Sequence, residues 1–508
     1  MKKVFHNKMK VLGLCTLMCI TGCSKSEAVD SENEIITTPT PIQEPTDPNS
    51  NSNSTTPTGN YIQLNPSVTY QTIDGFGAGI KRRTEDLYVL DASLREQVEA
   101  YCFRDLEVNM IRFFVYHDLE PENDNDDPFV LDESSLDWAR YDSSPVTWKT
   151  RYVAEALQNA FNLSQNGFDH VIGNCNSAPP WLKTNGQHNG GGTLIAGEEE
   201  EFSEFLVAFL KGMKSRYGID VTAISPTNEP DYEVSYESMN TTTPELTEIL
   251  KNLDQRLTSE GLNAIDILSP ECFRVSSANT NVSTLNYINR LFSDATVQDA
   301  VDIVGTHTYA DREFTADWQG LKSASAQKPI WVTESANLRS QDHTMTDAAN
   351  YIKWMVNGFN EGGMTAYMMH LFYEEVKEDG YSGLVAWTSD GQIALPKRYH
   401  TFKHFTNLVK KGYKLINSQI VRGNFWVTAF KAPDDSKIVL QIFNEGAEQE
   451  VSFDIPEGTE SIQHYITSNA VGENFSLQSE INLVEGDQFF STTMPSLSLH
   501  SFEFNRNP

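Results

Sequence analysis

The chain has 508 residues and a formal net charge of −32, with 39% hydrophobic and 11% aromatic residues. This length predicts two or three folding units, and the composition is typical of a globular protein with a large core. The negative charge argues against long-range attraction to nucleic acid or to an anionic membrane surface. We therefore expect a neutral or locally recognised ligand.

The first 23 residues have the pattern of an export signal. Four lysines within the first ten residues precede an apolar run from Val11 to Ile20, which is too short to span a bilayer. The run ends in Ile20-Thr21-Gly22-Cys23, which resembles the bacterial lipobox and predicts cleavage before Cys23 and lipidation of its thiol. An ordinary signal peptide with a chance cysteine is the alternative. We expect an exported protein that a lipid attaches to the bacterial cell envelope, at the outer membrane or the cell surface, without a transmembrane helix.

Residues 24–59 are rich in Ser, Thr, Pro and Asn and poor in aromatic residues, which predicts a disordered linker. Three cysteines follow the linker, namely Cys102, Cys175 and Cys272. Their odd number and wide spacing argue against a disulfide framework and against a zinc site. We expect each to be a small buried apolar residue.

Between residues 60 and 410, short apolar strands alternate with amphipathic helices, as in parallel β/α architecture. Helical patterns include 201–217, 244–262 and 345–360. The predicted strands are 73–80, 108–117, 169–176, 221–227, 264–270, 301–308, 329–334 and 364–372. Eight such units over this length favour an α/β fold of the (β/α)8 TIM barrel type over a doubly wound sheet.

Residues 411–508 have a different sequence pattern. The helical patterns stop, and short strands with alternating polarity, such as 425–430 and 437–443, follow one another between turn residues. This pattern predicts an antiparallel β-sandwich domain. Residues 61–70, just before the first barrel strand, are also strand-like and are a candidate to complete that sandwich.

Two carboxylates end apolar runs that we predict to be the fourth and seventh barrel strands. Glu229 lies in Asn228-Glu229-Pro230, and Glu334 closes Trp331-Val332-Thr333-Glu334. Active sites of such barrels lie at the carboxyl ends of the strands. Two carboxyl groups facing one sugar are what hydrolysis of a glycosidic bond requires. Glu229 is the candidate proton donor and Glu334 the candidate nucleophile; surface residues at strand ends are the alternative.

From Ile62 to the C-terminus, the chain resembles glycoside hydrolase family 30, a group of retaining β-glycanases in the large clan with catalytic glutamates on strands four and seven. The resemblance is carried by Gln71-Thr72-Ile73-Asp74-Gly75-Phe76-Gly77-Ala78, by Ser177-Ala178-Pro179-Pro180-Trp181-Leu182-Lys183, by Asn228-Glu229-Pro230 and by Thr333-Glu334. It implies a barrel followed by a sandwich that shares the N-terminal strand.

The resemblance also implies roles for single residues. Glu229 takes the place of the acid/base and Glu334 that of the nucleophile. Asn228 takes the place of the amide that bonds the sugar 2-hydroxyl. The other matches are Arg112 as a cation beside the nucleophile, His307 and Tyr309 as an aromatic pair on the sixth strand, and Trp181 as a surface that stacks on a sugar. Core packing is the alternative for His307 and for Trp181.

Two features depart from the family pattern. Lys81, Arg82 and Arg83 are consecutive basic residues after the first strand, and they could grip a uronate carboxylate; ion pairing with neighbouring acidic residues is the alternative. The eighth strand lacks the tryptophan of many family members, and Trp387 is a candidate to replace it.

No metal or organic cofactor is expected, because two carboxylates suffice for this chemistry. The acidic run 122–127 lacks the central Gly and closing Glu of an EF-hand loop, so a solvated turn is favoured. Gly75-Phe76-Gly77-Ala78-Gly79 lacks the phase of a dinucleotide-binding loop.

The sequence therefore predicts a retaining glycoside hydrolase that cleaves β-glycosidic bonds of a polysaccharide by double displacement. Endo-acting cleavage of glucuronoxylan or of β-1,6-linked glucan or galactan is the leading expectation. We expect a monomer that binds no nucleic acid. A catalytically silent glycan-binding protein on the same fold and a transglycosylase are the alternatives.

Overall fold

The computed structural model describes residues 57–80, 84–125, 127–143, 147–338, 340–378, 380–483 and 486–507. The predictions on the signal segment, on Cys23 and on residues 24–56 of the linker lie outside these residues. Those on Lys81, Arg82 and Arg83 do so as well.

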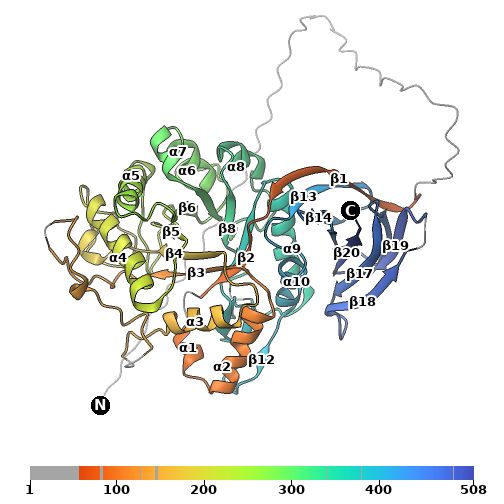
Figure 1. Cartoon of the computed structure of the whole chain (residues 1–508), viewed down its shortest axis with the longest axis horizontal. Coiled ribbons are helices and arrows are strands. Elements are labelled where there is room, and N and C mark those ends of the chain that lie inside the picture. Colours follow the sequence, from red (N-terminus) through yellow and green to blue (C-terminus); the bar gives the residue numbers. More distant parts are fainter. Residues whose placement is uncertain are drawn as a thin grey trace, which may run out of the picture. The chain divides into compact units, whose positions relative to one another are not determined.

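Eight strands close into a barrel in chain order (Figure 1). Each strand is parallel to its neighbours, including the closing pair of the first and last strands. The strands are β2 (Gly75–Gly79), β3 (Met110–Val115), β4 (His170–Cys175), β5 (Ala223–Ser225), β6 (Asp266–Cys272), β7 (Ile303–His307), β8 (Ile330–Glu334) and β9 (Ala366–Met369). The predicted fold class is confirmed, and every predicted barrel strand overlaps an observed one.

Helices alternate with these strands and lie on the outside of the barrel (Figure 1). The long helices begin and end at recognisable signals: α5 starts with a capping box between Thr242 and Glu245, and α4 ends at Gly218, whose φ is 70°. The α-helices are α1 (Thr84–Tyr88), α2 (Ala92–Glu99), α3 (Val153–Leu163), α4 (Glu199–Tyr217), α5 (Thr243–Ser259), α6 (Thr284–Leu291), α7 (Ala295–Ala300), α8 (Trp318–Ala324), α9 (Met345–Asn360) and α10 (Lys397–Thr406). Short π- and 3₁₀-helical turns are Ala100–Arg104, Glu133–Ser135 and Pro180–Leu182. Among the described residues, we find no helix with the length and apolarity needed to cross a membrane.

Side chains inside the barrel form an apolar layer with a polar layer above it. The apolar layer is one buried cluster of Met110, Ile172, Ala223, Leu268, Ile303, Trp331, Ala366 and Met368. Because side chains alternate along a strand, the residues two positions further on β3, β4 and β5 face the same interior. Those residues are Arg112, Asn174 and Ser225, all fully buried. The strands therefore carry polar groups inward at their carboxyl ends.

Gly77, in the opening motif, is required by close packing of the first two barrel strands. A Cβ atom there would lie 2.2 Å from the carbonyl oxygen of Met110 on β3. Any side chain would therefore force β2 and β3 apart.

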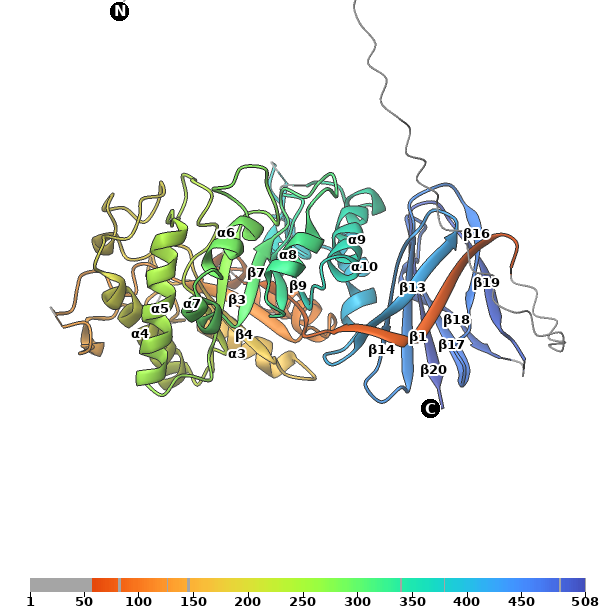
Figure 2. The same ribbon diagram turned by 90° about the horizontal axis from the view of Figure 1, so that it is seen from above.

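Nine of the other described strands build a separate sheet. In spatial order these are β18 (Asn474–Asn482), β17 (Thr459–Thr467), β20 (Ser498–Arg506), β15 (Lys437–Asn444), β14 (Trp426–Lys431), β13 (Lys414–Arg422), β1 (Asn60–Thr72), β16 (Gln449–Asp454) and β19 (Phe489–Met494). Its pairs are antiparallel except for β1 with β16, and it curls around its own apolar core, which includes Leu440, Phe453 and Phe502. Figure 2 shows β1 beside β13, so the strand-like segment at 61–70 belongs to this sheet.

Buried histidines fill the contact between α10 and this sandwich. Nδ1 of His404 lies 2.7 Å from the Ser501 hydroxyl, and Nε2 lies 2.9 Å from that of Thr467. On the sandwich side, His464 and His500 are joined by a 2.8 Å hydrogen bond. Burial lowers the pKa of His464 to about 4 and that of His500 to about 3, and it holds the pKa of His404 well below its ordinary value.

We predict that this contact weakens in acid. The histidine pKa values are lower in the folded than in the unfolded protein. Below about pH 6.5, the unfolded chain therefore binds protons that the folded protein does not bind, and the free energy of unfolding decreases. The change His404→Gln removes one such group. In urea denaturation, the difference in unfolding free energy between wild type and His404→Gln should shrink by about 1 kcal/mol or more from pH 7.5 to pH 5. A pH-independent difference would contradict this.

Candidate active site

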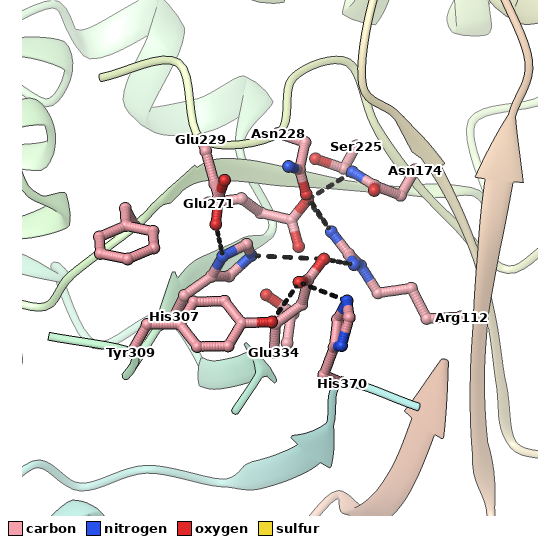
Figure 3. A network of polar contacts seen from close by, with 12 residues as sticks. Arg112, Asn174, Ser225, Asn228, Glu229, Glu271, His307, Tyr309, Glu334 and His370 are labelled. Carbon is pink, nitrogen blue, oxygen red and sulfur yellow. Dashed lines mark hydrogen bonds and ion pairs between the residues drawn. The ribbon is translucent and has the colours of Figure 1, made fainter. Parts of the chain in front are cut away.

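A buried arginine is the centre of the polar layer. Arg112, on β3, is fully buried, and its guanidinium donates to carboxylates of Glu334 and Glu271 and to the side-chain oxygen of Asn228. The bonds to Asn228 and Glu271 are both 2.9 Å long. Figure 3 shows that these groups converge from strands on several sides of the barrel. The arginine thus joins Asn228 and Glu334, which were predicted from two separate motifs.

Glu334 ends β8 and is surrounded by donors. The Tyr309 hydroxyl donates to Oε2 of Glu334 over 2.7 Å, and Nε2 of His370 lies 3.7 Å from the same oxygen. Burial raises the pKa of Tyr309 well above its ordinary value, and the negative charge of Glu229 adds to this effect. The tyrosine therefore stays protonated as a donor. Together with the Arg112 guanidinium, it favours the charged form of Glu334.

Glu229 faces Glu334 from the end of β5, in an unusual backbone conformation. Its φ is +49°, a value that is rare for residues other than glycine, and its amide donates to the carbonyl of Glu271 over 2.9 Å. One carboxylate oxygen lies 3.0 Å from Nδ1 of His307, and the other accepts a 3.1 Å hydrogen bond from Tyr236. Such strain is typical of functional sites that the surrounding structure holds in place.

Glu229 and Glu334 are close neighbours across the barrel mouth. One oxygen of each carboxylate and one nitrogen of His307 all lie within 4.8 Å of one another. These three side chains are 0–6% exposed, so they form a nearly closed group. A metal ion here would face the positive charge of Arg112, which already neutralises Glu334. The donor set therefore fits an ion-paired carboxylate couple better than a metal centre.

A third carboxylate was not predicted from the sequence. Glu271, at the end of β6, is fully buried with φ +59°, and it accepts hydrogen bonds from Arg112 over 2.9 Å and from Asn174 over 2.8 Å. Because Arg112 bonds both Glu271 and Glu334, the buried arginine shares its charge between two carboxylates. Glu271 is the last residue but one of β6 and directly follows the predicted strand 264–270, which is the sequence signal that could have revealed it.

Aromatic rings extend from the Glu334 side of the site toward the surface. Tyr309 stacks on Phe273 with ring centroids 5.3 Å apart, and Phe273 stacks on the exposed Tyr232 at 4.5 Å. Asp231 holds this row in place, because its carboxylate accepts from the amides of Phe273 over 3.1 Å and Ser283 over 2.7 Å. Apolar ring faces beside paired carboxylates are suited to binding sugars.

The loop between β5 and α5 is anchored at the two residues that follow Tyr236. Glu237 pairs with Nδ1 of His117 over 2.6 Å, and Nζ of Lys183 donates to the carbonyl of Ser238 over 2.6 Å. Burial lowers the pKa of Lys183 to about 8. The loop thus presents the tyrosine hydroxyl to Glu229 from a fixed backbone.

Two predicted sugar-binding tryptophans have structural contacts. Trp387, in β11 (Val385–Trp387) of a small sheet with β10 (Tyr373–Glu375) and β12 (Ile393–Ala394), is only 1% exposed and packs against Tyr373. It cannot offer a ring face to a ligand, and this prediction is corrected. Trp181 is partly buried against the main core, and its indole nitrogen donates to the carbonyl of Glu120 over 3.0 Å.

The acidic run 122–127 forms a surface turn where the structure describes it. Asp127 is exposed, and its carboxylate accepts from the amide of Phe129 over 3.1 Å. Asp126 lies outside the described residues.

Comparison with known proteins points to glycoside hydrolases. A family model described as glycosyl hydrolase family 59 matches residues 170–390, a stretch that contains both Glu229 and Glu334. This is a different family number from the one that the sequence motifs suggested, and the match covers less than half of the chain.

Several similar proteins are named as xylanases or glucanases. The chain is 27% identical over 317 residues to glucuronoxylanase XynC of Bacillus subtilis, covering 60% of this chain and 66% of that protein, just under two thirds of its length. The catalytic domain of GH30 xylanase C from Talaromyces cellulolyticus superposes with a TM-score of 0.70 at 20% identity, over 88% of this chain and all of that one. An endo-β1,6-glucanase superposes with a TM-score of 0.67 at 18% identity, over 88% and 94%. The chain is therefore similar to glycoside hydrolases and shares the fold of these structures.

We predict that Glu271 is required for stability. The change Glu271→Leu removes the buried carboxylate that accepts from both Arg112 and Asn174, which costs about 3 kcal/mol of unfolding free energy. Urea denaturation measures this loss. As a control, Lys214→Met removes an exposed ion pair with Asp220 and should cost about 0.5 kcal/mol or less. Equal losses in the two variants would contradict the assigned role of Glu271.

Proposed function

We propose that this chain is a retaining glycoside hydrolase of family 30 that cleaves β-glycosidic bonds by double displacement. The observation that carries the proposal is the approach of Glu229 and Glu334 to within 4.8 Å around His307. Retaining enzymes hold their two carboxyl groups about 5–5.5 Å apart, whereas inverting enzymes leave about 6.5–9.5 Å for a water molecule.

In the first step, a carboxylate oxygen of Glu334 attacks the anomeric carbon while the glycosidic C–O bond breaks. Glu229 gives its proton to the departing oxygen, so the leaving sugar departs as an alcohol. Arg112 and Tyr309 keep the nucleophile charged and oriented before attack. Asn228, held by Arg112, takes the place of the amide that bonds the sugar 2-hydroxyl in the family.

In the second step, water replaces the leaving sugar. Glu229, now a carboxylate, takes a proton from this water as its oxygen bonds to the anomeric carbon, and the bond to Glu334 breaks. The configuration at the anomeric carbon is inverted twice and therefore retained.

The proposed substrate is a β-linked polysaccharide, with glucuronoxylan and β-1,6-linked glucan or galactan as the leading choices. The names of the similar proteins support both choices. We further propose that the protein is exported and attached to the cell envelope through a lipid on Cys23, on the basis of its N-terminal motif.

The test is product analysis of purified protein on glucuronoxylan, β-1,6-glucan and β-1,6-galactan. Wild type should release oligosaccharides from one of them, with the β-anomer appearing first by NMR. Glu334→Gln should lower the rate at least about 1,000-fold, whereas Glu448→Gln, which changes an exposed carboxylate of the sandwich, should match wild type. Binding without release of product by wild type would instead favour a silent glycan-binding protein.

We also predict that Tyr236 tunes the acid/base. Its hydroxyl donates to Glu229 and so favours the charged carboxylate. In Tyr236→Phe, Glu229 should keep its proton to higher pH, and the alkaline limb of the kcat/KM profile should shift upward by about one pH unit. Tyr70→Phe, which removes an exposed hydroxyl on β1, is the matched control. Superimposable profiles for wild type and Tyr236→Phe would refute this role.

A further inference from the structure

A pocket of about 410 Å³ lies at the carboxyl ends of β6 and β7, beside the carboxylate pair rather than over it. Its walls come from the segments 274–278 and 310–317 and from Leu285 of α6. These segments begin one residue after Phe273 and Tyr309, the stacked rings that lead to Glu334. The pocket is therefore continuous in the chain with the walls of the candidate active site.

The pocket combines an apolar floor with polar groups of both kinds. Val275 and Leu285 supply apolar surface, and Ser277 and Thr315 supply hydroxyl groups. Concave sites with this mixture are those that bind small ligands.

Two charged side chains in the walls have buried polar atoms. Nε of Arg274 makes no hydrogen bond to any described group, while its guanidinium lies 5.6 Å from the centre of the Phe273 ring. Asp311 is 5% exposed, and its carboxylate accepts from the amide of Ala316 over 3.2 Å and from the indole of Trp318. Burial raises the pKa of Asp311 to about 6. The pocket therefore combines a buried donor without a partner, Nε of Arg274, with a buried carboxylate.

The hydrogen-bond donors and acceptors in the pocket walls indicate which chemical class of ligand fits. An anion would meet the carboxylates of Asp311 and Asp317, and an apolar ligand would leave Nε of Arg274 without a partner. The hydroxyl groups of a neutral sugar both donate and accept, so one sugar can bond both Arg274 and Asp311. Its ring can also lie on the apolar floor.

We propose that this pocket is a binding subsite for a neutral sugar unit of the same glycan that the carboxylates cleave. The proposal rests on the proposed function and adds a second point of contact beside the bond-breaking site. The sugar can be the next unit of the main chain or a neutral branch, and the two sources share the same chemistry.

The experiment measures binding by calorimetry in Glu334→Gln, in which hydrolysis is blocked. The probes are linear xylo-oligosaccharides and β-1,6-gluco-oligosaccharides of increasing length, and arabinose-branched xylo-oligosaccharides. The added change Ala278→Trp fills the pocket from an exposed wall position. The control Ala264→Trp puts the same bulk on an exposed position before the amino end of β6, away from the barrel mouth.

We expect Ala278→Trp to weaken binding at least 10-fold for the ligands that reach the pocket, with no change for Ala264→Trp. Arg274→Met should act in the same direction through its lost donor. Loss confined to long linear ligands identifies the main-chain unit, and loss confined to branched ligands identifies the branch. Equal affinities in the Ala278→Trp protein and its parent, for every ligand, overturn the subsite while leaving the proposed function intact. If the parent binds none of the probes and wild type cleaves none of the three polysaccharides, the proposed function itself has failed, and the subsite with it.

Discussion

The buried guanidinium of Arg112 is the constraint on which the rest of the site depends. A cation inside a barrel is tolerated only if carboxylates and dipoles surround it, because burying an uncompensated charge is very costly. Arg112 has such partners from three other strands or strand ends: Glu334, Glu271 and Asn228. Each of these partners is in turn held by the arginine. The contacts that balance the charge of Arg112 in the interior are therefore the same contacts that fix the positions of these side chains at the barrel mouth.

The barrel meets that requirement through the alternation of side chains along its strands. Met110 and Ile172 close the lower interior with apolar atoms, and two residues later Arg112 and Asn174 occupy the level above. The apolar layer excludes water from beneath the polar layer, which strengthens each electrostatic contact within it. The same alternation explains why the polar groups gather at the carboxyl ends of the strands and are replaced below by apolar ones.

The sequence was sufficient for the barrel and for Glu229 and Glu334, because a carboxylate that closes an apolar run has no packing role and stands out. Glu271 escaped prediction because Ser269 and Pro270 separate it from the apolar Ile267 and Leu268 of its strand. The Trp387 prediction failed for a different reason. Burial of that ring depends on β10 and β12, which join it only in the folded chain. A sequence pattern indicates the alternation of polar and apolar residues along a strand, but it does not indicate which other strands will pack against that strand.

The two carboxylates are chemically alike, and their surroundings make them different. Glu334 is held by a guanidinium and a tyrosine that burial keeps protonated, so its charge is compensated before any ligand arrives. Glu229 instead contacts an imidazole, whose charge depends on pH, and the hydroxyl of Tyr236. A group that must gain and lose a proton in each cycle is better served by neutral partners, whereas a nucleophile is better served by a fixed cation. The proposed roles of the two carboxylates therefore agree with the contact of Arg112 with Glu334.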